Sequence, residues 1–191
     1  MSSIAVTGSA TGTGVISLLA PVTNTNRTIN LPDSNGTIVT SATAGVPING
    51  PAFSAYADAT TQTFVTSTYT KVLFQTEEFD TNSCFASSRF TPTVAGYYQV
   101  NAQALFAFGA STGTSLVSVY KNGAVFKEGS RTFISSASSG ANVISILIYL
   151  NGSTDYAEIY AQQASGVNQN LTGGNNKELN YFQAAMIRSA V

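Results

Sequence analysis

Few side chains in this sequence could catalyse a reaction, and their types limit the possible chemistry. There is no histidine and a single cysteine, Cys84, which excludes Ser-His-Asp and Cys-His nucleophiles and Cys/His zinc sites. Among the nine acidic residues, Glu77, Glu78 and Asp80 lie closest together, and Glu78 and Asp80 would share one strand face. A glycosidase needs two carboxyl groups about 5–9 Å apart across a cleft, with separated pKa values. Neighbouring carboxylates on one strand are more typical of a solvated surface, so we expect no enzyme.

Oxygen ligands alone could bind calcium, which needs neither histidine nor cysteine. The candidate ligands are Asp80, Asn82, Asp155 and Glu158, but their spacing matches no compact calcium loop. We therefore predict no cofactor, with calcium left open. Aromatic rings could stack on sugars, although in a β-rich chain they more often belong to a core or an interface. The candidates are Tyr97, Tyr149, Tyr156, Tyr160, Tyr181 and Phe182.

The charge of the chain argues against nucleic acid and membrane partners. Only 9% of residues are charged and the net charge is −1, with 8 basic and 9 acidic side chains. No basic excess exists to neutralise phosphates and release counterions. The first residues lack the pattern of a secretory signal, and the longest apolar run, Val143–Leu150, is far below the ~18 residues of a membrane helix.

The segments that carry these residues are predicted to be β-strands throughout. Val, Ile, Thr, Tyr and Phe dominate segments that are separated by Gly and Asn turns, and no segment has helical periodicity. Tight turns are expected at Asn122-Gly123 and Asn151-Gly152. Short strands at this spacing predict an all-β jelly-roll sandwich. The expected strands are Phe53–Ala57, Tyr69–Gln75, Cys84–Phe90, Tyr97–Phe108, Leu116–Tyr120, Ala124–Lys127, Val143–Leu150, Tyr156–Gln162 and Tyr181–Arg188.

One expected strand, Val143–Leu150, is apolar on both faces. Ile144, Ile146, Ile148 and Leu150 can line a core, which leaves the other face in need of a second partner. A covering loop is one explanation, but we favour a subunit interface. The residues expected at it are Tyr97, Leu105, Val143, Leu147, Tyr149 and Tyr181.

Alternating strand directions place every second connection at the same end of the domain. The longer polar loops, Gly109–Thr114, Ser135–Asn142 and Ala164–Glu178, should therefore share one end, and the tight turns the other. Loops on a rigid scaffold often carry recognition, although they could equally be solvated connections. The residues available there for host contact are Ser111, Thr112, Ser138, Ser139, Asn168, Asn170, Asn175 and Asn176.

Residues 1–50 differ from the rest and are predicted to form a β-rich attachment arm and linker, followed by a head domain at 51–191. Apolar side chains are too few here for an independent core. The segment Thr43–Pro51 has two prolines and two glycines, as expected of a linker. The arm residues expected to make contacts are Val15, Ile16, Leu18, Arg27, Ile29 and Leu31.

The segment Phe90–Ala102, with Gly96-Tyr97-Tyr98 entering a long strand, resembles the most recognisable motif of the complement and tumour-necrosis-factor-like jelly roll. The hairpins around Lys121-Asn122-Gly123 and Asn151-Gly152, and the strand Tyr181–Arg188, are similar to later parts of that fold. The resemblance covers about Pro51–Val191 and implies a trimer. Val100 and Ala102 stand where aromatic residues are often found, and the collagen stalk of complement proteins is absent, which argues against an immune role.

The segment Asn26–Val39 resembles segments of tailed-bacteriophage structural and fibre proteins. This resemblance implies a homotrimeric, non-enzymatic protein on the virion surface, assembled in the host cytoplasm. We expect a capsid decoration or cement protein whose arm binds the major capsid protein, because the chain starts at its own methionine without a coiled coil or repeat shaft. The alternatives are the receptor-binding tip of a tail fibre or tailspike, held by a tail adaptor, and a free lectin-like module. In each, the head could contact host surface polysaccharide.

Overall fold

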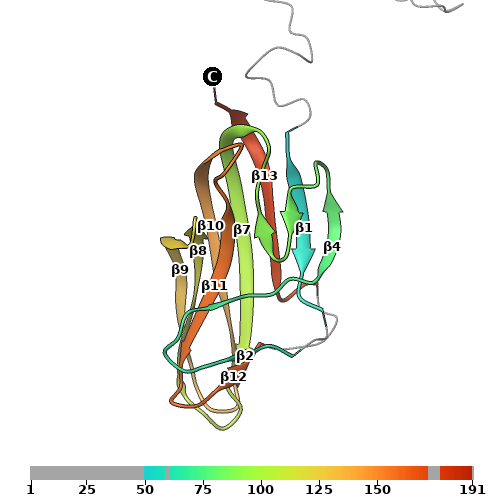
Figure 1. The fold of residues 1–191 in the computed structure, drawn as a ribbon. Helices are drawn as coiled ribbons and strands as arrows, with labels where there is room; N and C mark the ends of the chain where they lie inside the picture. The colour runs from blue at the N-terminus through green and yellow to red at the C-terminus, as the bar shows by residue number, and fades with distance from the viewer. Residues whose placement is uncertain (1–49, 59–60, 172–176, 191) are drawn as a thin grey trace, which may run out of the picture. The chain divides into compact units, whose positions relative to one another are not determined.

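A computed structural model describes residues 50–58, 61–171 and 177–190, and these residues fold as a β-sandwich (Figure 1). One layer is a five-stranded sheet in the order β10-β7-β13-β1-β4. Its strands are β1 (Ala52–Tyr56), β4 (Thr76–Asp80), β7 (Ala95–Ala107), β10 (Ser139–Asn151) and β13 (Tyr181–Ser189). The last strand, β13, lies between β1 and β7, which is the crossover pattern of a jelly roll.

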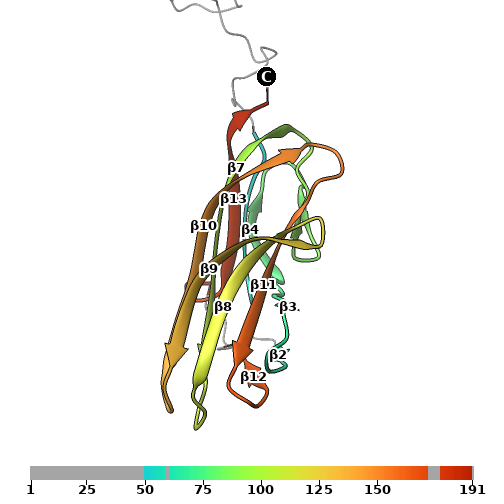
Figure 2. The ribbon, with the colours of Figure 1, turned by 90° about the vertical axis from the view of Figure 1, so that its left-hand side faces the viewer.

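The second layer is a six-stranded sheet whose main path is β5-β6-β11-β8-β9, with β3 paired to β11 beside β6. Its strands are β3 (Thr70–Lys71), β5 (Phe85–Ala86), β6 (Arg89–Phe90), β8 (Gly113–Lys121), β9 (Ala124–Ile134) and β11 (Ala157–Ala164). A two-stranded pair, β2 (Thr63–Phe64) and β12 (Gln169–Asn170), completes the described part. Figure 2 shows the long strands of both layers running side by side. No helix within the described ranges is long and apolar enough to cross a membrane.

The core follows from the alternation of buried and outward residues along the two longest strands. In β7, Tyr98, Val100 and every second residue to Phe106 are buried. In β10, Ile144, Ile148 and Leu150 are buried, and Ile146 is half-buried against the core. Aromatic side chains fill the space between the sheets at one end, where Phe53 stacks on Phe85 and Phe90. Burying large rings between two sheets provides much of the apolar area that stabilises a sandwich. The predicted all-β jelly roll and its inward residues are confirmed.

Two predicted strands were wrong. The segment Cys84–Phe90 is a tight hairpin of β5 and β6, because Ser87 and Ser88 both have positive φ (52° and 57°) and turn the chain. The segment Tyr69–Gln75 contains only the short strand β3. Its backbone leaves the sheet after Val72, whose N–H donates to the carbonyl of Ile159. β4 forms the edge beside β1. It was not among the expected strands, although Glu78 and Asp80 were expected on one strand face.

The connections divide between the two ends as predicted. The loops after β7 and β9 contact one another, since Phe108 N–H donates to the carbonyl of Ser138 and Ala137 N–H to that of Gly109. The tight turns meet at the opposite end, where Asn122 N–H donates to the carbonyl of Tyr156. β1 begins at this second end, beside the last residues of β13 (Figure 1).

The long edges of the two sheets are joined by side chains of β9. Ser130 accepts a hydrogen bond from the backbone N–H of Val143 (2.8 Å), and the Thr132 hydroxyl donates to the carbonyl of Ala141 (3.2 Å). Gly129 allows this approach, because a Cβ there would lie 2.5 Å from the carbonyl oxygen of Val143. These hydrogen bonds occupy part of the outer backbone edge of β10, which reduces the chance that this edge pairs with another chain.

Candidate functional site

The outward face of the five-stranded sheet collects every residue predicted for a subunit interface. We call this surface the interface face. Its exposed apolar side chains include Tyr97 (48% exposed), Leu147 (59%) and Val143 (48%). β7 and β10 pair in register, so that Tyr149 lies opposite Tyr97 and Val143 opposite Gln103. The interface face carries the predicted residues Tyr97, Leu105, Val143, Leu147, Tyr149 and Tyr181 because their strand neighbours point into the core.

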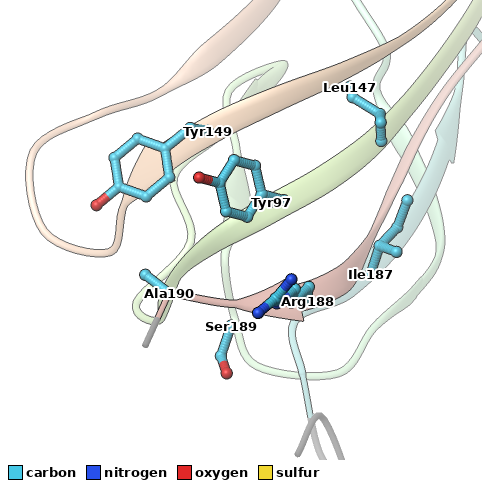
Figure 3. A pocket seen from close by; sticks show the side chains of 7 residues that line it. All are labelled: Tyr97, Leu147, Tyr149, Ile187, Arg188, Ser189 and Ala190. Carbon is cyan, nitrogen blue, oxygen red and sulfur yellow. The ribbon is translucent and has the colours of Figure 1, made fainter. Parts of the chain in front are cut away.

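One end of the interface face is hollowed (Figure 3). The depression has a volume of about 700 Å³, and the rings of Tyr97 and Tyr149 lie side by side in it, with centroids 5.5 Å apart. The hydroxyl of Ser189 at its edge is buried with no hydrogen-bond partner among the described residues. An apolar hollow of this kind is suited to an apolar side chain of a partner surface. It is lined by Tyr97, Leu147, Tyr149, Ile187, Arg188, Ser189 and Ala190.

Uncharged amides occupy the middle of the interface face. Gln99 donates to the hydroxyl of Ser145 (2.9 Å) and lies beside Asn101, with Gln183 opposite Asn101 on β13. A second, smaller depression of about 250 Å³ lies here and reaches Phe79, which is 50% exposed. This region can form hydrogen bonds to another surface through its amides, whereas the hollowed end offers mainly apolar area together with Arg188 and Ser189. Neither region holds an acid-base pair.

The acidic residues considered for catalysis are used structurally. Glu78 accepts a hydrogen bond from the hydroxyl of Ser54 (2.8 Å). Asp80 accepts hydrogen bonds from the backbone N–H groups of Cys84 (3.1 Å) and Phe85 (2.8 Å), which hold the turn after β4. Burial alone would raise the pKa of Asp80, but these backbone hydrogen bonds outweigh it, and the pKa is lowered. A general acid would need the opposite shift.

The candidate calcium ligands are not gathered into one site. Asp155 pairs with Lys121 at 2.8 Å, and Glu158 pairs with Lys71 at 2.7 Å and with Arg89 at 2.8 Å. Cations therefore already occupy the places where a metal ion would bind these carboxylates. Within the residues that the structure describes, no group of three or more His, Cys, Asp or Glu side chains could hold a metal ion.

The predicted loop residues lie at one end of the sandwich. Ser111 is half-buried, and Thr112, Ser138 and Asn168 are exposed. Asn170 is part of β12 rather than of a loop, and its side-chain oxygen accepts a hydrogen bond from the Thr63 hydroxyl (2.9 Å). Ser139 begins β10 and is exposed. Outside the described residues lie Asn175, Asn176 and the predicted arm residues Val15, Ile16, Leu18, Arg27, Ile29 and Leu31.

The aromatic residues considered for sugar stacking fall into separate places. Phe182 is fully buried in the core, which is the position that the sequence analysis favoured over sugar stacking for these aromatic residues. Tyr156 and Tyr160 lie on the outward face of the six-stranded sheet, away from the interface face. They are joined there by Tyr120 and Tyr69, which the sequence did not single out. The available signal was weak, because Leu116 and Ser118, which share the strand face of Tyr120, are buried together with Val117 and Val119.

No protein-family model and no curated protein sequence matches the chain. Solved structures do match it. Murine APRIL aligns at a TM-score of 0.53 with 11% identity, over 72% of this chain and 99% of that one. The globular domain of zebrafish complement 1qA protein aligns at 0.50 with 18% identity, over 74% and 99%. Eiger TNF from S. frugiperda aligns at 0.51 with 8% identity, over 74% and 94%.

These likenesses establish the fold. The described domain is a jelly roll of the kind seen in complement globular domains and tumour-necrosis-factor-like proteins, as the motif around Gly96-Tyr97-Tyr98 predicted. At such low identities the shared fold does not assign a function.

Proposed function

We propose that this protein is a non-enzymatic structural protein that works as a homotrimer, associated through the interface face. The observation that carries the proposal is the set of exposed apolar side chains on that face, from Tyr97 and Tyr149 to Leu147 (59% exposed). Soluble monomers rarely leave large contiguous apolar patches in water, and such patches usually mark association sites. The likeness to complement and tumour-necrosis-factor-like jelly rolls supports a trimer.

The charge of the interface face favours a second copy as its partner. Its central residues Gln99, Asn101 and Gln183 are neutral amides, and Arg188 is the cation at the hollowed end. A face that meets a copy of itself must avoid opposing like charges, which destabilise a contact. Neutral amides and apolar rings meet this condition.

The substitution Val143→Glu tests the proposal. It puts a charge on the interface face at a side chain that is 48% exposed, so the isolated domain should still fold. We expect a homotrimer for the unchanged protein and a monomer for Val143→Glu by light scattering after size exclusion, because burying an unpaired carboxylate is costly. Val125→Glu is the matched control, since Val125 is also 48% exposed but lies on β9. A monomeric unchanged protein would contradict the proposed association.

We further propose that the trimer decorates the capsid of a tailed phage, with residues 1–50 attached to the shell. The resemblance of Asn26–Val39 to phage structural proteins supports this role, as does the low charged fraction of 9%. The copy number of the protein in purified virions, relative to the major capsid protein, tests it. A ratio of a few per virion would indicate a tail fibre tip instead, and absence from virions would contradict both placements.

A further inference from the structure

A charged cluster lies on the outward face of the six-stranded sheet, where β3 and β6 both meet β11. Glu158 at its centre is 2% exposed. Its Oε1 atom accepts hydrogen bonds from Lys71 Nζ (2.7 Å) and Arg89 Nε (2.8 Å). Two cations around one carboxylate leave a net positive charge at this position, in a chain whose net charge is −1.

The guanidinium of Arg89 is held in a fixed orientation with its outer edge toward solvent. Glu158 binds its Nε–H, and its central carbon lies 3.8 Å from the centroid of the Tyr156 ring. The side chain is nevertheless 44% exposed. A guanidinium has five N–H donors, so the four on its terminal nitrogens remain for a further acceptor. A fixed planar fork of this kind suits a bidentate contact with a carboxylate or sulfate group.

Tyrosine rings extend from this cluster across the sheet. Tyr160 stacks on Tyr120 with centroids 3.9 Å apart, and Tyr69 lies 6.0 Å from Tyr120. Opposite Tyr160 in register is Ser118, whose buried hydroxyl has no hydrogen-bond partner among the residues described. Half-buried aromatic rings beside polar groups are amphipathic surfaces on which a sugar ring can pack its C–H groups while its hydroxyls bind nearby donors.

We propose that this cluster, formed by Arg89, Lys71, Tyr156 and Tyr160, binds an acidic glycan. The anionic group pairs with the terminal nitrogens of Arg89, and the sugar rings lie along the tyrosines. The site is on the opposite sheet from the interface face, so a bound glycan does not compete with association. The proposal rests on the proposed role at the virion surface and names a site for the contact with host polysaccharide that the sequence analysis expected. This site lies on the six-stranded sheet rather than in the end loops.

Calorimetry with the full-length protein tests the proposal with three probes of similar length. They are oligogalacturonate, which carries carboxylates, a sulfated dextran oligosaccharide, and neutral maltoheptaose. We expect binding of at least one acidic probe and none of maltoheptaose. Arg89→Lys keeps a cation near Glu158 but removes the planar fork, and should weaken binding about tenfold or more. Arg188→Lys is the matched control, because Arg188 is also exposed but lies on β13 of the other sheet, and it should change the affinity less than about twofold.

Light scattering on the same samples separates this proposal from the proposed function. If neither acidic probe binds while the protein stays a trimer, the glycan site is wrong and the structural role stands. If Arg89→Lys and Arg188→Lys weaken binding equally, the contact is a general electrostatic attraction and the site is also overturned. If the unchanged protein is monomeric but still binds an acidic probe with the predicted Arg89 dependence, the proposed trimer fails and the glycan site stands.

Discussion

Glu158 connects three strands that are far apart in the sequence. Lys71 and Arg89 reach it from positions 87 and 69 residues away, on β3 and β6. β3 and β6 both pair with β11, each through only two residue pairs, so backbone hydrogen bonds alone hold them weakly. Burial alone would raise the pKa of Glu158, but the hydrogen bonds from Lys71 and Arg89 outweigh it, and the pKa is lowered from its ordinary value. The ion pairs therefore help to hold β3 and β6 in place.

The substitution Glu158→Gln should destabilise the protein at neutral pH by about 1–2 kcal/mol, because it leaves the partly exposed charges of Lys71 and Arg89 without their carboxylate partner. A lowered native pKa contributes stability that is complete above the unfolded pKa and is lost as the pH falls through the native pKa. Urea unfolding at a fixed protein concentration should thus show a large difference between Glu158→Gln and the unchanged protein at pH 7, which shrinks by pH 3. A difference that is the same at both pH values would contradict the assignment. Glu77→Gln, at an exposed residue of β4, is the control and should stay within about 0.5 kcal/mol.

The strands β9 and β10 close one side of the sandwich together, through several contacts along their length. Side chains of Ser130 and Thr132 bind the backbone edge of β10. This approach requires the absence of a side chain at Gly129, where a Cβ would lie 2.7 Å from Ile144 Cβ. Packing at this distance leaves no room for rearrangement, since protein interiors are close-packed.

Gly129→Ala should therefore destabilise the domain by about 1–3 kcal/mol, the usual cost of overpacking. The midpoint of urea unfolding measures this effect. Lys127→Ala, at an exposed position of the same strand, should move the midpoint little. An unchanged midpoint for Gly129→Ala would mean that β9 does not approach β10 as closely as described.

The two sheets give the whole head two different surfaces. The interface face has apolar and amide side chains, whereas the six-stranded sheet carries Lys71, Arg89 and Glu158 on its outward side. Contacts made by the interface face should depend on the apolar area that they bury. Contacts made by the outward side of the six-stranded sheet should depend on charge.

Raising the NaCl concentration from about 0.05 to 0.5 M should therefore leave the trimer intact, because salt screens exposed charges and does not weaken apolar burial. Light scattering across this range measures the mass. Binding of the acidic probe should weaken over the same range. Dissociation of the trimer by salt alone would show that ion pairs hold the subunits together.

Much of the fold could be predicted from local patterns. Alternation in β7 and β10 separated Tyr98 and Ile148, which are buried, from Tyr97 and Leu147, which are exposed. The Asn-Gly pairs also predicted the turns at Asn122-Gly123 and Asn151-Gly152. The structure has positive φ at Asn122 and at both glycines. The hairpin at Ser87-Ser88 could not be, because serine seldom adopts positive φ and gives no turn signal of that kind.

Local sequence pattern was sufficient to separate inward from outward side chains in strands such as β7 and β10, because the two-residue period of a strand is a local property. Which outward side chains become neighbours depends on how the strands pair in the folded domain. The cluster of Lys71, Arg89 and Glu158 depends on the register between β3, β6 and β11. That register is set by contacts between distant segments, and the chain between them carries no local record of it.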